Sequence, residues 1–419
     1  MRHVQIAILG GGIAGLGAAL RARELGQQAV VFEARTSAGG LLDNFVVDGF
    51  RFDNAVHLSF ASEPEVRRIF DRTPYLTHQA DSKCFDSGVW LKHPVQNNLF
   101  PLPAEHKVTL IKSFLARPDI AEPANYEQWL LSQYGEEIAC RWPIAYTQKY
   151  WGTSAERLSV NWIGNRMRRA ELDEILYGAF TGDTPNTYYT KEMRYPKAGG
   201  YKAFIQTLVD EAEIVLNARV TDVDPVSRRI EFADGSQICY DRLVSTLPLP
   251  VLVSMMSNVP EDVKTAAGNL EATSIDLISV GFNVPLNLDL WFYIYDSDIF
   301  ASRAYSPSVK SPDNAPAGCS SLQFEVYQRG RMARFSPEEL KDNVRYAIKK
   351  MCIAADENIL FLHHKRLPWG NVIFDLGMEE DRQRVRDHLA IHDIASCGRF
   401  GEWDYLWSNQ SLISGYKSI

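Results

Sequence analysis

The sequence lacks the patterns that mark several common classes of protein. Its six cysteines are scattered without C-x-x-C spacing or a nearby histidine arrangement, so neither a zinc site nor a disulfide framework is indicated. It has no apolar run of about 18 residues, the length needed to cross a bilayer. The net charge is −8, and no basic cluster offers a footprint for a phosphate backbone, which argues against nucleic acid as a partner.

The remaining composition is that of a folded globular protein. Hydrophobic residues make up 46% of the chain and charged residues 23%, which excludes a disordered chain. The 419 residues predict two or three domains. A strand pattern begins within the first residues and leaves no room for a signal peptide, so we expect a cytoplasmic protein. The oligomeric state is left open.

The N-terminal segment has the pattern of a βαβ unit. Residues 4–9 form an almost continuous apolar run, typical of a strand buried on both faces of a parallel sheet. The glycine cluster Gly10–Gly15 follows directly, and apolar residues then recur at helical spacing until Gly26. Residues 28–33 predict the next strand.

The glycine cluster fits the pattern G-x-G-x-x-G of dinucleotide-binding proteins. Glycines let a pyrophosphate approach the backbone at a helix N-terminus, and the carboxylate of Glu33 is placed to accept hydrogen bonds from a ribose. The alternative is an ordinary tight turn between a strand and a helix, which the complete βαβ context disfavours.

The type of secondary structure predicted for the rest of the chain changes along the sequence. Residues 104–175 show helical spacing, whereas residues 214–247 and 272–330 show strands, with a hairpin turn at Asp234-Gly235. We expect a doubly wound, Rossmann-like α/β cofactor domain formed by residues 1–100, 190–260 and 365–419. Residues 101–189 are expected to form a helical domain, and residues 261–364 an antiparallel substrate sheet.

Two further motifs resemble a large superfamily of FAD enzymes that includes the amine oxidases, protoporphyrinogen oxidase and UDP-galactopyranose mutase. The stretch from Glu33 to Gly39-Gly40-Leu41 resembles their E-x(5)-G-G element. Residues 52–57 resemble the F-D-x-G-x-H element of the mutase and its relatives, in which the histidine, here His57, lies near the flavin. Ala55 replaces the usual glycine. We expect tightly but non-covalently bound FAD, because the glycine fingerprint and Glu33 are complete and no histidine or cysteine lies in a recognisable flavin-attachment sequence.

Other stretches resemble UDP-galactopyranose mutase in particular. Residues 90–98 resemble W-x-x-Y-P-x-Q-N-N, with His93 in place of the tyrosine, and residues 126–166 run parallel to the helical domain of that family. The spacing from Trp291 to Arg303 matches its substrate strand. The resemblance implies that Arg166 and Arg303 bind a substrate diphosphate.

The C-terminal residues 398–405 resemble the G-R-x-G-x-W-x-Y element of the same family, and residues 195–200 resemble its Y-P-x-x-G-G turn beneath the flavin. Together these likenesses imply three sets of site residues. Cofactor-binding residues are Gly10, Gly12, Ile13, Ala14, Gly15, Glu33, Ala34, Gly39, Gly40, Leu41, His57, Val220, Gly398, Arg399, Tyr405, Asn409, Gln410 and Ser411. Substrate-binding residues are Gln96, Trp151, Arg166, Trp291, Tyr293, Arg303, Asn371 and Tyr405, and catalytic residues are Arg166, Arg303 and His57.

Two further positions depart from the family pattern. Asn371 lies at or near a phosphate-binding tyrosine, and Thr147 replaces an asparagine close to the sugar and the flavin. Altered groups around retained arginines indicate either a different sugar or base, or loss of the mutase chemistry.

The resemblance therefore implies a mutase that interconverts pyranose and furanose forms of a nucleotide hexose in polysaccharide biosynthesis, with N5 of reduced FAD as nucleophile. NAD(P)H or another reductant would supply the electrons. The alternative is an oxidase of the amine or protoporphyrinogen type, which shares the glycine motifs and the C-terminal turn. Only Gln96-Asn97-Asn98, Arg166 and the spacing from Trp291 to Arg303 favour the mutase. A scaffold that binds FAD without catalysis is a third reading.

Overall fold

A computed structural model describes the chain except for residues 1, 80, 165–166, 168–170, 186–191 and 331. Its first sheet has the strand order β10-β11-β12-β1-β2-β9, and β18 pairs with β12. These strands are β1 (Arg2–Leu9), β2 (Ala29–Phe32), β9 (Ile214–Val215), β10 (Val220–Asp224), β11 (Arg229–Phe232), β12 (Gln237–Ser245) and β18 (Ile394–Ser396). The pairs that join β1, β2, β9, β12 and β18 are parallel.

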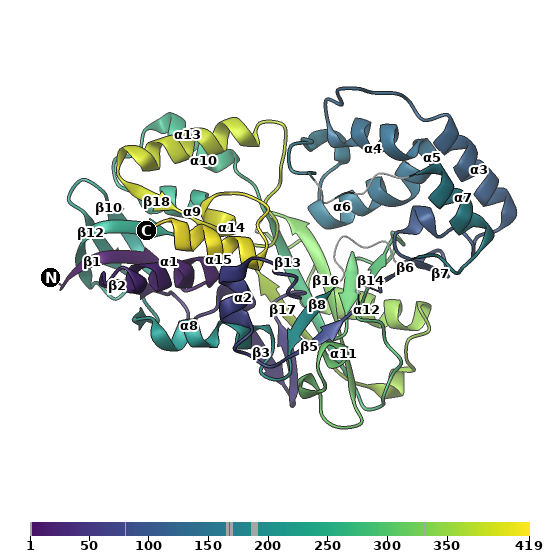
Figure 1. Ribbon diagram of the computed structural model, residues 1–419, viewed down its shortest axis with the longest axis horizontal. Coiled ribbons are helices and arrows are strands. Elements are labelled where there is room, and N and C mark those ends of the chain that lie inside the picture. Colours follow the sequence, from purple (N-terminus) through teal and green to yellow (C-terminus); the bar gives the residue numbers. More distant parts are fainter. Residues whose placement is uncertain (1, 80, 165–166, 168–170, 186–191, 331) are drawn as a thin grey trace.

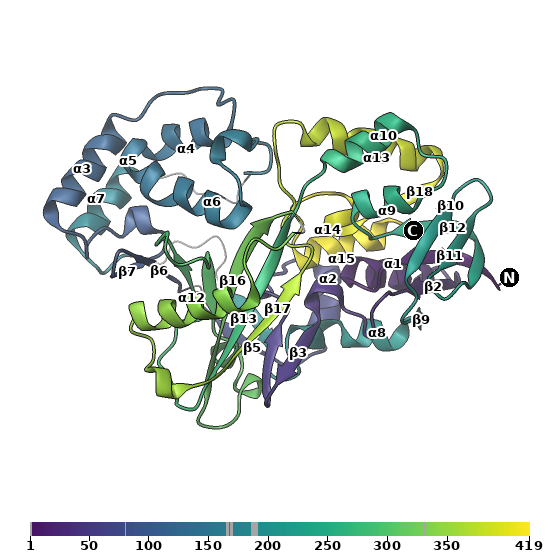
Figure 2. The ribbon, with the colours of Figure 1, turned by 180° about the vertical axis from the view of Figure 1, so that it is seen from behind.

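Both faces of this sheet are covered by helices, as the apolar run of β1 predicts. Ile6 and Ile8 pack with the alanines of α1, whereas Ala7 and Leu9 belong to the cluster on the other face. Figures 1 and 2 show α1 and α15 on one side and α9, α10 and α13 on the other. The helices around the sheet are α1 (Ile13–Glu24), α2 (Pro64–Phe70), α8 (Gln206–Glu211), α9 (Leu249–Met255), α10 (Glu261–Asn269), α13 (Met378–Ile391), α14 (Gly398–Gly401) and α15 (Ser408–Lys417).

A second sheet has the order β17-β13-β16-β15-β14-β6-β7. Its strands are β6 (Lys83–Asp86), β7 (Val89–Lys92), β13 (Thr273–Phe282), β14 (Trp291–Ile294), β15 (Arg303–Tyr305), β16 (Ser320–Arg329) and β17 (Ile359–Leu367). All neighbours are antiparallel except β6 and β14, which run parallel. The antiparallel sheet expected within residues 272–330 is confirmed, and it is extended by strands from elsewhere in the chain.

The segment between β7 and residue 180 is mainly helical. Its helices are α3 (Ala104–Leu115), α4 (Tyr126–Tyr134), α5 (Glu136–Ala139), α6 (Ala145–Trp151) and α7 (Leu172–Phe180). Figure 1 shows them grouped at one end of the molecule, beside the second sheet. Smaller elements complete the fold: β3 (Asn44–Val47), β4 (Phe50–Asp53), β5 (Tyr75–His78), β8 (Met193–Pro196), α11 (Pro307–Lys310) and α12 (Pro337–Lys350).

The predicted fold class, a Rossmann-like α/β unit with a helical insertion and a mainly antiparallel sheet, is confirmed. The hairpin at Asp234-Gly235 is also present, between β11 and β12, with Gly235 at φ 80°. The division into three domains stays a prediction, although β6 and β7 pair with the second sheet rather than with the first. Among the described residues, no helix is both long enough and apolar enough to span a membrane.

Candidate active site

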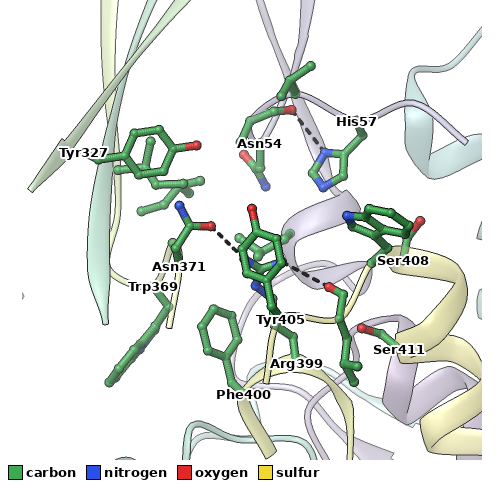
Figure 3. Close-up of a pocket in the computed structure, with 18 of the residues that line it drawn as sticks. Asn54, His57, Tyr327, Trp369, Asn371, Arg399, Phe400, Tyr405, Ser408 and Ser411 are labelled. Carbon is green, nitrogen blue, oxygen red and sulfur yellow. Dashed lines mark hydrogen bonds between the residues drawn. The ribbon is translucent and has the colours of Figure 1, made fainter. Parts of the chain in front are cut away.

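A cavity of about 1420 Å³ lies where the first sheet, the second sheet and α6 meet. One end is lined by the glycine turns of the first sheet, and the other end by aromatic residues of α6, β14 and β16. Figure 3 shows side chains of the Asn54–His57 segment and of the C-terminal turn pointing into the same space. Segments that are far apart in sequence therefore form one site.

The glycine end has the features of a dinucleotide cradle. Helix α1 begins after Gly12 without a side-chain cap and without an acidic residue in its first turn, so its N–H groups are available to an anion. A Cβ built on Gly12 would meet only the Cα of Gly40, at 3.9 Å, whereas one on Gly15 would lie 2.0 Å from the carbonyl oxygen of Gly10. Gly12 is thus open toward the cavity, and Gly15 serves close packing inside the turn.

Glu33 closes this end of the cavity at the carboxyl end of β2. Its side chain is buried and accepts hydrogen bonds from the backbone N–H groups of Gly11, at 2.8 Å, and Arg35, at 2.9 Å. These bonds fix the carboxylate beside the turn. A carboxylate has about four acceptor sites, so further hydrogen bonds from ribose hydroxyls can be added. Residues and geometry therefore fit a bound dinucleotide.

The Asn54–His57 segment lines the middle of the cavity. Ala55, which replaces the family glycine, adopts φ 73° in the left-handed region, so the alanine is accommodated there. His57 Nδ1 lies 3.1 Å from the carbonyl oxygen of Ala55, and burial lowers the pKa of His57 to about 4. The ring is neutral at pH 7. Because a carbonyl only accepts, the proton is on Nδ1 and Nε2 is left as an acceptor.

Arg303 lies on β15 directly opposite Glu325 on β16. Its Nε donates to Glu325, and its Nη2 donates to the hydroxyl of Tyr327 at 2.7 Å. The Glu325 carboxylate raises the pKa of Arg303 against the effect of burial, so the guanidinium is charged. A buried guanidinium needs an anion nearby, and Glu325 supplies one from the protein itself.

A second guanidinium comes from the C-terminal turn. Arg399 lies over the ring of Tyr405, with 4.6 Å between Cζ and the ring centre, and its Nη2 donates to Asn371 Oδ1 at 2.7 Å (Figure 3). The hydroxyls of Tyr405 and Tyr150 are 2.9 Å apart. Because arginine only donates, Asn371 must present Oδ1 to it. Asn371 Nδ2 is buried without a hydrogen-bond partner among the described residues.

Most of the predicted site residues line this one cavity. They are Gly10, Gly12, Ile13, Ala14, Glu33, Ala34, Gly39, Gly40, Leu41, His57, Gln96, Trp151, Val220, Trp291, Tyr293, Arg303, Asn371, Gly398, Arg399, Tyr405 and Ser411. His93 and Thr147, which also depart from the family pattern, line it too, and the His93 ring lies 4.7 Å from that of Tyr293. Their individual roles stay predictions.

Four predicted residues are not placed in the cavity wall. Gly15 packs within the turn as described above. Asn409 donates to Glu63 at 2.8 Å, and Gln410 accepts from the backbone N–H of Trp407 at 2.9 Å, which caps α15. Arg166 lies outside the described residues, so its predicted contact with a diphosphate stays a prediction.

Sequence reasoning missed several residues of the cavity wall, among them Tyr150, Tyr327 and Lys365. Tyr327 follows Glu325 by two positions, so both point to the same face of β16. That alternation, together with the pairing of Arg303 with Glu325, is the signal that could have found them. Lys365, on β17, donates to Asn54 Oδ1 at 2.8 Å and had no sequence signal of its own.

The fold and the site together define a flavoprotein, because comparisons with known proteins agree with the dinucleotide cradle. A model described as a flavin-containing amine oxidoreductase matches residues 131–375, and one described as an NAD(P)-binding Rossmann-like domain matches residues 8–73. The chain belongs to the flavin-containing amine oxidoreductase family.

Solved structures with the same fold come from both branches considered above. A crystal structure of reduced UDP-galactopyranose mutase superposes with a TM-score of 0.92 at 23% identity, over 99% of this chain and 94% of that one. A candidate protoporphyrinogen oxidase from Exiguobacterium sp. 255-15 gives 0.72 at 16% identity, over 100% and 98%. Putrescine oxidase bound to putrescine gives 0.65 at 16% identity, over 99% and 98%. At these identities the likeness shows the fold.

Proposed function

We propose that the protein is an FAD-dependent mutase that interconverts the pyranose and furanose forms of a nucleotide hexose. The observation that carries this proposal is the charge of the cavity. Among the described lining residues, Glu33 is the one carboxylate, and it lies at the dinucleotide end. The basic lining residues are Arg35, Arg219, Arg303, Lys365, Arg366 and Arg399. A cavity with this imbalance favours an anionic ligand.

Two of these cations have hydrogen bonds only to neutral oxygens in the described structure. Arg399 donates to the carbonyl of Leu406 and the amide of Asn371, and Lys365 donates to Asn54. Their charges are therefore not cancelled by direct hydrogen bonds to carboxylates. A diphosphate that reaches Arg303 and Arg399 would gain charge-assisted hydrogen bonds.

The chain's own groups fit three tasks of a mutase. Arg303 binds the leaving diphosphate, and the neutral His57 offers an acceptor at Nε2. Tyr150, Trp151 and Tyr405 form an aromatic wall that excludes water from the reacting carbon. Bound FAD, in its reduced form, would supply the nucleophile. No acid–base dyad of the protein is needed for this role.

The departures at Thr147 and Asn371 support a ligand that differs from the usual one near the sugar. The Thr147 hydroxyl donates its hydrogen to the carbonyl of Pro143, in the turn before α6, at 2.7 Å, so that hydrogen is not available to a ligand. Asn371, which also lines the cavity, has an amide N–H group without a hydrogen-bond partner among the described residues. We therefore propose that Asn371, rather than residue 147, donates to the substrate. Which sugar and which base are bound is left to experiment.

An oxidase of the amine type is the second candidate, and the family match favours it. An amine substrate is a cation in water, however, and the cationic lining would repel it. A neutral oxidase substrate would not meet that objection. The two candidates therefore differ in the sign of charge that the cavity accepts.

We expect the holoprotein to bind uridine diphosphate and not putrescine. Isothermal titration at pH 7.5 with each ligand in turn measures this, and the UDP affinity should fall as salt is raised, because salt screens the interaction. Uridine is the control for the diphosphate group and should bind much more weakly than UDP. Binding of putrescine but not UDP would favour the oxidase.

A further inference from the structure

One buried carboxylate joins the substrate end of the cavity to the segment beside the cofactor. Glu325 is fully buried on β16. Its Oε2 accepts from Arg303 Nε and from the hydroxyl of Tyr327, the latter at 2.7 Å. Its Oε1 accepts from the backbone N–H of Val56 at 2.7 Å. Glu325 therefore contacts both the candidate diphosphate ligand Arg303 and the Asn54–His57 segment.

The Val56 bond holds a segment that has no regular secondary structure of its own. Val56 lies between Ala55, whose φ is 73°, and His57, whose ring faces the cavity. A backbone N–H at such a position needs a buried acceptor, and an ionised carboxylate gives a stronger hydrogen bond than a neutral one. The position of His57 therefore depends on where the Glu325 carboxylate is held.

The position of the Glu325 carboxylate depends in turn on Arg303. The guanidinium uses Nε for Glu325 and Nη2 for Tyr327, which leaves Nη1 for a ligand among the described contacts. An anion bound at the guanidinium competes with Glu325 for the same positive charge. When an anion binds the guanidinium, the hydrogen bond from Arg303 to Glu325 weakens. The hydrogen bonds from the other donors to the Glu325 carboxylate, including the one from the Val56 N–H, then become stronger.

We propose that Glu325 is a positioning residue that couples anion binding at Arg303 to the Asn54–His57 segment. This inference rests on the proposed function, because that function places the diphosphate at Arg303. Binding of the anion strengthens the hydrogen bond from Val56 to Glu325 and holds His57 more firmly beside the cofactor. The coupling uses side chains already in contact and needs no movement of whole elements.

The variant Glu325→Gln tests the coupling through the flavin spectrum. Val56 donates to Oε1 of Glu325 and Arg303 to Oε2. Glutamine has an acceptor oxygen at only one of these two positions and a donor NH2 group at the other, so it cannot replace both hydrogen bonds. UDP should bind the variant as tightly as wild type or more tightly, because the competing carboxylate is gone. The change in flavin absorbance at saturating UDP should fall below about half of the wild-type change, because the charge-assisted link is lost.

Glu271→Gln is the matched control, since Glu271 pairs with Arg329 and neither residue lines the cavity. It should give the wild-type absorbance change. A full absorbance change in Glu325→Gln at saturating UDP would overturn the proposal.

A second measurement on the unaltered holoprotein decides the matter even if Glu325→Gln does not fold. Hydrogen exchange of the Val56 amide, followed by mass spectrometry of the peptide that contains it, should be slower by about twofold or more with saturating UDP. Unchanged exchange, with UDP binding shown by calorimetric heat, would overturn the coupling and leave the proposed function in place. Absence of any heat from UDP would overturn both.

Discussion

Arg303→Ala is expected to weaken UDP binding by about tenfold to more than a hundredfold. The variant removes one or two charge-assisted hydrogen bonds to the diphosphate, which corresponds to ~1.5–3 kcal/mol. Arg303→Lys should recover part of the affinity, because an ammonium keeps the charge but lacks the planar fork of the guanidinium. Calorimetric titration of UDP into wild type and both variants measures the three affinities.

The structure adds a requirement to this experiment. Removal of Arg303 leaves Glu325 buried without its cation, and breaking such a pair typically costs ~3–5 kcal/mol of folding free energy. Thermal unfolding of each variant must therefore accompany the titration. Arg329→Ala is a control outside the cavity and should bind UDP as wild type does. Equal affinity in folded Arg303→Ala would remove Arg303 from the ligand site.

Gly12→Ala is expected to remove most of the bound flavin without unfolding the protein. The backbone of Gly12 has φ −77°, which alanine adopts freely, and the nearest protein atom to the new Cβ is 3.9 Å away. The added methyl group would instead occupy the space over the N-terminus of α1 where we place the pyrophosphate. Flavin released by heat, measured per mole of protein, should fall to less than about a tenth of the wild-type value, a loss of roughly 1.4 kcal/mol or more at limiting cofactor.

Gly268→Ala provides the control for a glycine-to-alanine change in a helix. A Cβ there meets no atom within 4 Å, and Gly268 lies on α10, away from the cavity wall. It should retain full flavin. Gly15→Ala makes the opposite comparison, because its Cβ would collide with Gly10, and it should destabilise the fold itself. Full flavin content in Gly12→Ala would place the cofactor elsewhere.

The fold could be predicted where the signal is local. The apolar run of β1, the glycine turn and the apolar-rich stretches of β13 and β16 each predict an element from a few residues of sequence. The hairpin of β6 and β7 has only four residues in each strand. Its place in the second sheet depends on pairing with β14, about two hundred residues later. Such a pairing has no local pattern, so the predicted boundary at residue 100 could not anticipate it.

The site shows the same division. Gly12, Glu33 and Arg399 lie in motifs whose chemistry can be interpreted from sequence, and the structure brings all three to one cavity. Glu325 lies in a strand that was predicted, yet its importance comes from contacts with Val56 and Arg303, which are set by register and by tertiary packing. The role of a buried carboxylate in a strand can be recognised only when the neighbouring strand and its register are known.

Turnover of reduced protein with nucleotide sugars tests the central claim most directly. Dithionite-reduced holoprotein is incubated with a panel of nucleotide hexopyranoses, and pyranose and furanose forms are resolved by anion-exchange chromatography. The account predicts conversion of at least one member of the panel, by reduced protein only, with loss of most conversion in Arg303→Ala. No conversion of any nucleotide sugar, together with oxygen-dependent peroxide release from an amine or a porphyrinogen, would contradict it.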